Sequence, residues 1–357
     1  MFEKLPFNKL RYKKAELPSN KINDFVLPAI TCTTENNGIS CYVKKENATI
    51  FKNCISVAAN GDAPVFYHSN EFTILQDAYV IDFKDKKLNK KENLFFTALL
   101  KKALKKFDWA NKSGWERVKN ENILLPTTQN GEINFEFMES FVAELEAERV
   151  AELEAYLAAA SLKDYELTAD ELSALSKFEN YNWGEFRIGD LFEMKNTFSF
   201  NKEKLTDGNE YDYVTRTSNN QGILQSTGFV NARNLNEAGI WSLGLLQMDF
   251  FYRQRQWYAG QFVRKIIPKI KLTQNSILFF TTLLNSQKNI LLSVLVRDVD
   301  KTFKNLKIKL PVTANDEIDF EFMNNFIKAI KKLVIKDVVL YTDNKIKATK
   351  SIVSSNQ

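Results

Sequence analysis

The feature that most constrains the fold of this chain is an internal repeat. The segment LPTTQNGEINFEFMESF at Leu125–Phe141 returns as LPVTANDEIDFEFMNNF at Leu310–Phe326, a shift of 185 residues with 11 of 17 positions identical. Solenoid repeats have periods of only about 20 to 50 residues, so this repeat is a duplicated domain. Two further phrases recur at a shift of 184 residues, namely LFFTALL (94–100) as LFFTTLL (278–284) and ITCTTENNGI (30–39) as VTRTSNNQGI (214–223).

The repeat divides the 357 residues into alternating globular and helical segments. Short apolar runs between Asn- and Gly-rich turns predict strands, and the LFFT segments predict helices that pack on a sheet. We therefore predict a mixed α/β (α+β) fold for each globular segment. The predicted strands are Cys54–Ala59, Ala78–Phe83, Tyr211–Thr215 and Gln261–Ile267. The predicted boundaries are 1–134 and 180–319 for the globular domains, 135–179 and 320–350 for helical spacers, and 351–357 for a C-terminal tail.

Each F-E-F-M motif is followed by a segment rich in helix formers, Phe141–Leu162 in the first repeat and Phe326 onward in the second. Apolar residues recur there mostly every three or four positions, which is typical of helices that pair along an apolar stripe. The stripes consist of Met138, Phe141, Leu145, Val150, Leu153 and Leu157, and of Met323, Phe326, Ile330, Leu333, Val334, Val338 and Tyr341.

The charges of the two helical segments are complementary. Residues 135–163 hold seven Glu and two basic residues, a net charge of −5, whereas residues 320–350 hold seven Lys and three acidic residues, a net charge of +4. We predict that the two helices form an antiparallel coiled coil, which makes the chain a pseudo-two-fold repeat. The alternative is that each helix packs only on its own globular domain.

Composition and motifs exclude several classes of function. The chain has one His, so His-dependent triads and multi-His metal sites are excluded, and it has neither a phosphate-binding G-x-x-x-x-G-K-[ST] loop nor a G-x-G-x-x-G motif. Cys32, Cys41 and Cys54 lack the spacing of a disulfide framework or a zinc site. No apolar run is long enough for a membrane span and no secretory signal is evident, so we expect a cytoplasmic protein.

The chain resembles the specificity subunits of Type I restriction-modification systems and the similar Type IIB subunits. The resemblance covers essentially the whole chain and rests on WGEFRIGDLFEMK at Trp183–Lys195, YVTRTSNNQGI at Tyr213–Ile223, the ILFFTTLL segment, the I-x-[LI]-P stretch before each helix and the repeat itself. One departure is that the first half opens with MFEKLPFNKLRYKKAELP, where only a faint version of the second opening phrase survives.

The resemblance implies a division of labour. Each globular half would be a target-recognition domain that reads one half of a split DNA sequence, and the helices would dock methyltransferase subunits, two in number, with restriction or translocase subunits as further partners. The methyltransferase would bring S-adenosylmethionine and the catalytic motif of an adenine-specific complex, so this chain itself would be non-catalytic and bind no cofactor or metal. A helix of about 30 residues is roughly 45 Å long, about 13 base pairs of B-form DNA.

Sequence readout uses Arg for guanine and Asn or Gln for adenine, while phosphates are held by Lys, Arg, Ser and Thr. For the Thr residues, and for Arg253, Gln254 and Arg255, the alternative role is to close a turn. For the Lys residues the alternative is a solvated helix face, and for His68 it is an ordinary surface position. The candidate DNA-binding residues are Thr31, Thr33, Asn36, Asn37, His68, Asn70, Lys101, Lys105, Thr215, Arg216, Thr217, Asn219, Asn220, Arg253, Gln254, Arg255 and Gln256.

Two other functions compete with the specificity subunit. A stand-alone DNA-binding scaffold or regulator would use the same two-domain geometry without a methyltransferase. A nuclease would need an acidic site, for which Asp190, Glu193 and Lys195 are the only suggestive group. Because three-residue E-x-K strings are common and this one lies in the domain-opening phrase, the sequence favours the specificity subunit.

Overall fold

The computed structural model describes the backbone of residues 1–355 and the side chains of residues 1–348. It divides into two compact units, Met1–Ala155 and Tyr156–Gln357, which we call the first and the second unit. The boundary falls near the end of the long helix α3 (Phe135–Ala159). Both units combine strands and helices, so the predicted mixed α/β fold is confirmed.

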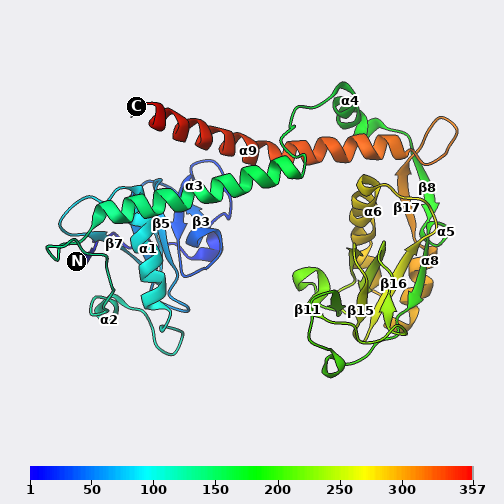
Figure 1. Cartoon of the computed structure of the whole chain (residues 1–357), viewed down its shortest axis with the longest axis horizontal. Helices are drawn as coiled ribbons and strands as arrows, with labels where there is room; N and C mark the ends of the chain where they lie inside the picture. The colour runs from blue at the N-terminus through cyan, green and yellow to red at the C-terminus, as the bar shows by residue number, and fades with distance from the viewer. Residues whose placement is uncertain (356–357) are drawn as a thin grey trace. The chain divides into compact units, whose positions relative to one another are not determined.

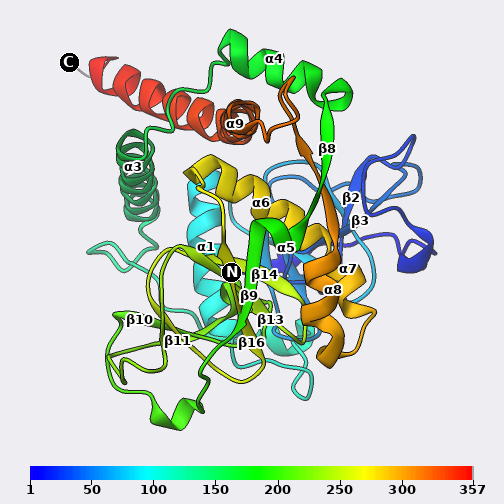
Figure 2. The same cartoon turned by 90° about the vertical axis from the view of Figure 1, so that its right-hand side faces the viewer.

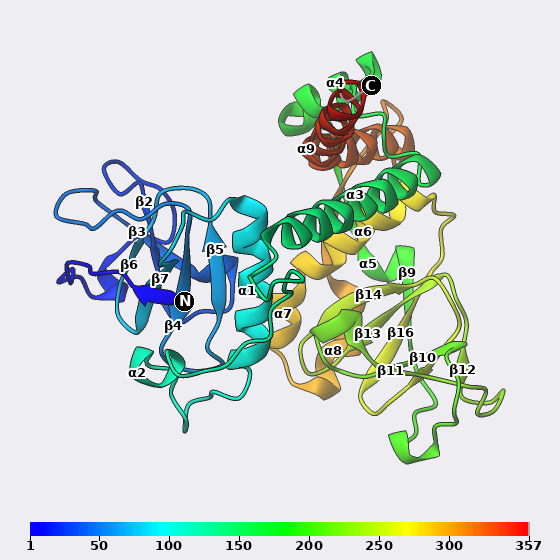
Figure 3. The same cartoon turned by 60° about the vertical axis from the view of Figure 1, so that its left-hand side comes forward.

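The first unit contains two sheets. One has the strand order β1-β7-β4-β5 and the other the order β3-β2-β6. Helix α1 covers β4 and β5 and buries Phe96 in the core (Figure 3). The elements are β1 (Phe2–Lys4), β2 (Leu27–Ile30), β3 (Ile39–Val43), β4 (Cys54–Ala58), β5 (Val65–His68), β6 (Thr73–Ile74), β7 (Ala78–Phe83), α1 (Lys90–Leu104) and α2 (Trp115–Val118), with short 3-10 turns at Lys14–Glu16 and Asn36–Gly38.

The second unit contains sheets of order β14-β13-β16-β9 and β11-β10-β15-β12, and the pair β17-β8. Its strands are β8 (Trp183–Arg187), β9 (Phe192–Asn196), β10 (Tyr211–Val214), β11 (Ile223–Thr227), β12 (Leu235–Asn236), β13 (Ile240–Gly244), β14 (Asp249–Arg253), β15 (Trp257–Ala259), β16 (Val263–Pro268) and β17 (Lys307–Pro311). Its helices are α4 (Ala169–Lys177), α5 (Ile188–Leu191), α6 (Gln274–Ser286), α7 (Lys288–Leu292), α8 (Val299–Asn305) and α9 (Phe320–Ser355). Short 3-10 turns lie at Phe178–Asn180, Lys202–Lys204, Asn219–Gly222 and Val296–Asp298.

The two units share one strand order. β9, β16, β13 and β14 follow one another in the second unit as β1, β7, β4 and β5 do in the first, and β10 pairs with β11 and β15 as β2 pairs with β3 and β6. β2 and β10 even carry a register irregularity at the same place, before Ile30 and before Val214. The predicted strands correspond to β4, β7, β10 and β16, and the LFFT segments lie in α1 and α6, as the repeat predicted.

Each long helix begins in the same way. α3 begins at Phe135 and α9 at Phe320, the first residues of the two predicted spacers, and the carboxyl or amide oxygen of the preceding Asn134 or Asp319 accepts a backbone N–H of the first turn. Met138 and the equivalent Met323 are fully buried in the core of their own unit. The first turns therefore pack on their own globular domain. The coiled coil and the symmetry between the units stay predictions.

The far ends of the helices differ from the prediction. α3 ends at Ala159, so the first spacer is not one helix but a helix, an irregular segment and α4. α9 continues to Ser355 (Figure 1), so most of the predicted C-terminal tail is helical, while residues 356–357 lie outside the described residues. No helix in the described part of the chain is both long and apolar enough to cross a membrane.

Helix α4 lies along α9 within the second unit (Figure 2). Lys332 on α9 pairs with the carboxylates of Asp164 at 2.8 Å and of the buried Glu171 at 3.1 Å. Two ring stacks extend the contact, Phe178 on Phe326 and Tyr181 on Phe322. These contacts fix the start of α9 to the chain segment that leads into β8.

Candidate functional site

A left-handed turn stands at the same position in both units, between β2 and β3 and between β10 and β11. The N–H of Thr31 donates to the carbonyl of Gly38 at 3.0 Å, and that of Thr215 donates to Gly222 at 2.8 Å. The last three residues of each turn have φ between 45° and 81°, a region that favours Gly and Asn. These residues are Asn36, Asn37, Gly38, Asn220, Gln221 and Gly222.

Several candidate side chains of this turn have structural partners. The hydroxyls of Thr33 and Thr217 each accept the backbone N–H two residues later, at 3.2 Å in both units. The side-chain amides of Asn36 and Asn220 donate to the carbonyl three residues later, at 3.5 and 3.3 Å. The residues that both halves share therefore shape the turn. Their predicted contact with DNA stays a prediction.

The structure corrects the expected exposure of Arg253 and His68, because both side chains are buried. Arg253 is 2% exposed, and its guanidinium donates to the hydroxyl of Ser242 and to the carbonyl of Gln221. His68 is 8% exposed, and its Nε2 lies 2.8 Å from the hydroxyl of Ser56. Burial lowers the pKa of Arg253 to about 10 and that of His68 to about 4. Arg253 does not line the cavity of the second unit, whereas His68, although largely buried, lines a cavity of the first unit.

The rest of the second predicted loop is exposed between β14 and β15. Gln254 and Gln256 are exposed. Arg255 donates from Nε to the Asp212 carboxylate at 3.1 Å and from Nη1 to the carbonyl of Asn209 at 2.9 Å. The hydrogen bond that Arg255 donates to the Asp212 carboxylate raises the pKa of Arg255 above its ordinary value. Arg255 is thus held by an ion pair at the surface, whereas the two Gln side chains are presented to solvent.

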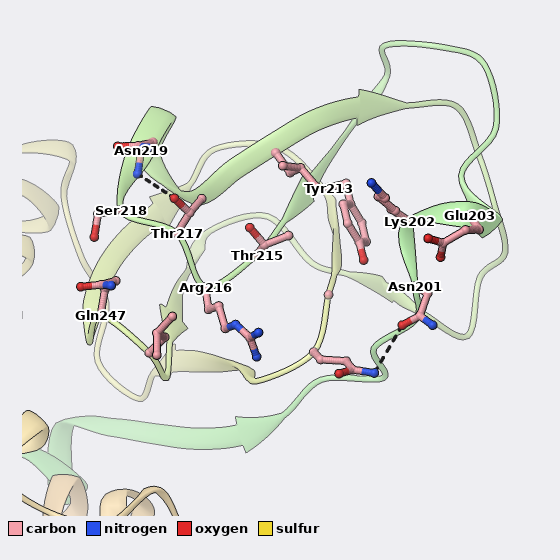
Figure 4. Close-up of a pocket in the computed structure, with 14 residues that line it drawn as sticks. Asn201, Lys202, Glu203, Tyr213, Thr215, Arg216, Thr217, Ser218, Asn219 and Gln247 are labelled. Carbon is pink, nitrogen blue, oxygen red and sulfur yellow. Dashed lines mark hydrogen bonds between the residues drawn. The ribbon is translucent and has the colours of Figure 1, made fainter.

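The second unit carries a polar cavity of about 660 Å³ beside the turn (Figure 4). Thr215 and Arg216 lie on one side of it and Lys202 on the other. The exposed Arg216 lies over the ring of Phe262, 5.2 Å from its centre, and makes no ion pair with a carboxylate among the residues that the structure describes. The lining residues are Asn201, Lys202, Glu203, Tyr213, Thr215, Arg216, Thr217, Ser218, Asn219, Leu224, Leu246, Gln247, Gly260 and Gln261.

The first unit carries a cavity of about 660 Å³ in a different place, between β2, β3 and the β5–β6 turn. It brings together Asn37, His68 and Asn70, three of the predicted residues. Its lining also includes three lysines that the sequence analysis did not select, Lys21, Lys45 and Lys52, and Lys45 pairs with Glu71 at 2.5 Å. The cationic lining suits phosphate oxygens.

The two candidate lysines at α1 are not among the residues that line either cavity. Lys101 is exposed and its ammonium lies 4.9 Å from the centre of the Phe66 ring. Lys105 is exposed directly after the last residue of α1, at the C-cap of the helix. Both positions agree equally with a phosphate contact and with a solvated helix face.

The acidic group weighed for a nuclease is divided between two neighbours. Asp190 accepts the guanidinium of Arg187 at 2.6 Å, and the pKa of Asp190 is lowered by that hydrogen bond. Glu193 pairs with Lys195 at 2.9 Å on strand β9. In the part of the chain that the structure describes, no group of three or more His, Cys, Asp or Glu could hold a metal ion.

Comparison with known proteins gives two matches of one family model, one within each unit. A family model described as the Type I restriction modification DNA specificity domain matches residues 1–155 and again residues 180–340. The chain belongs to this specificity-domain family. One copy of the family domain therefore covers each unit, and the resemblance to restriction-modification specificity subunits is confirmed.

Two relatives of the specificity family span nearly the whole chain. The specificity subunit S.BcgI of a Type II restriction enzyme from Heyndrickxia coagulans is 21% identical over 316 residues, 88% of each protein. A crystal structure of the Type-I restriction-modification S subunit from M. genitalium aligns with a TM-score of 0.50 at 15% identity, covering 99% of this chain and 94% of that one. The second likeness supports the two-unit fold.

Proposed function

We propose that this chain is the DNA specificity subunit of a restriction-modification complex, in which each unit reads one part of a bipartite target. The observation that carries the proposal is the double match of the specificity domain, one copy on each unit. The shared strand order gives both units the same framework, and the exposed polar side chains differ between them. Two equivalent frameworks with different side chains are what an asymmetric, split target requires.

The reading side chains are those that the turns and cavities leave exposed. In the second unit Arg216, Gln254 and Gln256 have the hydrogen-bonding groups that distinguish guanine and adenine in the major groove. In the first unit Asn37 and Asn70 have the amides, and the lysines of the cavity would neutralise phosphates. The shared framework would position each unit along the duplex, and these side chains would determine which bases it recognises.

The helices α3 and α9 would pair as an antiparallel coiled coil that spaces the two units on the duplex. Their opposite net charges of −5 and +4 favour such a pair. The 25 residues of α3 correspond to roughly 37 Å, or about 11 base pairs, when each residue adds 1.5 Å. The spacing between the two half-sites would then be fixed by helix length.

The helices would also dock two methyltransferase subunits, and these subunits would bind S-adenosylmethionine and methylate adenine. This chain would be non-catalytic within that complex and would work in the cytoplasm, where the DNA is. The family match supports the recognition role.

The test is to co-express the chain with the methyltransferase encoded beside it and to map methylated adenines across the host genome. We expect a split motif with a fixed gap that appears only when this chain is present. A chain lacking residues 1–134 serves as the matched control, because it should lose one half of the motif. A soluble complex that leaves no new methylation would favour the stand-alone scaffold or regulator.

A further inference from the structure

A buried pair of polar side chains occupies the same position in both units. In the β4–β5 hairpin His68 lies opposite Cys54, and in the β13–β14 hairpin Arg253 lies opposite Ile240. Two residues further along the inner strand stand Ser56 and Ser242. Each serine hydroxyl also lies within hydrogen-bond distance of the carbonyl opposite it, at 3.5 Å in the first unit and 3.4 Å in the second. The pairs Ser56–His68 and Ser242–Arg253 are therefore structural equivalents.

The two pairs support the left-handed turn in different ways. Arg253 donates to the hydroxyl of Ser242 from Nε at 2.9 Å and from Nη2 at 2.7 Å, and Nη2 also donates to the carbonyl of Gln221 inside the turn at 2.5 Å. A Cβ added to Gly222 would lie 3.2 Å from the same Nη2. The guanidinium is thus a strut between the sheet and the turn.

In the first unit the imidazole makes contacts of another kind. Its Nε2 reaches the Ser56 hydroxyl at 2.8 Å, and the ring packs on Phe72 with the centres 4.3 Å apart. The turn of this unit rests on apolar atoms, since a Cβ on Gly38 would lie 3.1 Å from Ile30 and 3.2 Å from Phe66. The turn has the same backbone conformation in both units. Hydrogen bonds from a guanidinium support it in the second unit, and apolar side chains support it in the first.

Arg253 is not an ordinary core residue. Burying a guanidinium is costly unless its donors are satisfied, and here a hydroxyl and a backbone carbonyl accept them. Removing the side chain would leave the Gln221 carbonyl without this donor next to residues that line the polar cavity, such as Thr215 and Asn219. The loss would therefore destabilise the left-handed turn between β10 and β11.

We infer that Arg253 is a positioning residue for base reading by the second unit, and that the Arg-for-His difference at this buried position is one determinant of why the two units read different sequences. The inference rests on the proposed function. Arg253 would touch no base itself. It would hold the turn so that the exposed side chains beside the cavity meet the base edges in one geometry.

The test uses the full chain in complex with its methyltransferase. For each variant one measures methylation of the correct target and of targets with one altered base in either half, and forms the ratio for each half separately. We expect Arg253→His to lower the discrimination of the second half-site about tenfold, within the range of a single mismatched base pair. The discrimination of the first half-site should stay unchanged.

Two milder variants test the same inference if Arg253→His does not fold. Arg253→Lys keeps a charge but reaches fewer acceptors, so it should lose less discrimination than Arg253→His, and Ser242→Ala should act in the same direction. The matched control Ser56→Ala should affect only the first half-site. A loss shared equally by both half-sites, or full discrimination in both Arg253 variants, would overturn the inference. A wild-type complex that methylates no split motif would instead refute the proposed function.

Discussion

The two units have the same strand order but differ in the side chains that line their cavities. The first unit lines its cavity with three lysines, two tyrosines and the amides of Asn37 and Asn70. The second lines a cavity in another place with Arg216, Gln247 and Gln261. In the phrase that both units share, by contrast, the hydroxyls and amides form hydrogen bonds to the backbone of the turn itself. The residues that repeat between the two units therefore build the shared fold, and the residues that differ line the surfaces available for recognition.

The largest effect should come from the core position that both units fill identically. Phe96 on α1 and Phe280 on α6 are both fully buried, and replacing either by Ala should cost about 3–5 kcal/mol of unfolding free energy. If the units are separate cores, Phe96→Ala will raise amide hydrogen exchange in β4 and β7 only, and Phe280→Ala in β13 and β16 only. Equal exchange in both units for either variant would argue against two independent cores.

The buried polar pair should give the first unit a pH dependence of its own. Burial lowers the pKa of His68 from 6.5 to about 4, so between these values the unfolded state binds more protons than the folded state. The first unit should lose about 3 kcal/mol as the pH falls from 7 to below 4, at 1.36 kcal/mol per pK unit. Arg253 stays charged over this range and adds no such dependence to the second unit.

The measurement is amide exchange in β4 and β5 at several pH values for the wild type and for His68→Gln. The variant should show a flatter pH dependence between pH 6.5 and 4 than the wild type, because the titrating group is gone. Parallel curves for the two proteins would contradict a neutral, buried imidazole.

A smaller effect is expected at the glycines that close the left-handed turns. Gly38 and Gly222 have φ of +81° and +78°, so Ala at either position should cost about 1–2 kcal/mol. Gly38→Ala should cost more, because its new Cβ meets the side chains of Ile30 and Phe66, whereas that of Gly222→Ala meets the end of Arg253. Chemical denaturation compares the two variants directly. Gly131→Ala is the control for backbone strain without a new contact, because Gly131 also has φ of +81° but no atom lies within 4 Å of its added Cβ.

The smallest effect concerns the caps of the two sheet-covering helices. Asn89 caps α1 and Thr273 caps α6, each by accepting the N–H three residues later. Ala at either position should cost about 1 kcal/mol. Because both caps serve the same framework, we expect similar losses in thermal unfolding of the two variants. A loss confined to one variant would show that the frameworks are not equivalent.

The sequence predicted the framework well because its signals are local or repeated. The run Ala78–Phe83 is β7 residue for residue, and both LFFT segments lie in the helices that cover the sheets. The sequence did not predict the burial of Arg253, because a charged side chain in a polar cluster is usually exposed. Its burial depends on the hydroxyl of Ser242, which lies 11 residues away across a hairpin.

The cavity residues were missed for a related reason. Gln247 and Gln261 come from loops that share no phrase with the first half, and only the fold places them beside Arg216. The lysines of the first cavity likewise come from three separate segments. No periodicity or motif links such positions, since their proximity is created by strand order.

Strand β8 can pair only after β17 has been synthesised much later in the chain. Lys307 and its partner Glu185 are 122 residues apart, and the Tyr181–Asp319 hydrogen bond spans 138. A ribosome that adds about 5–20 residues per second needs roughly 6 to 24 s to make that stretch. The first unit closes its sheet when Phe83 reaches Phe2, long before β17 exists. During that interval β8 lacks the strand with which it pairs in the finished unit, so the nascent second unit exposes an unpaired strand edge.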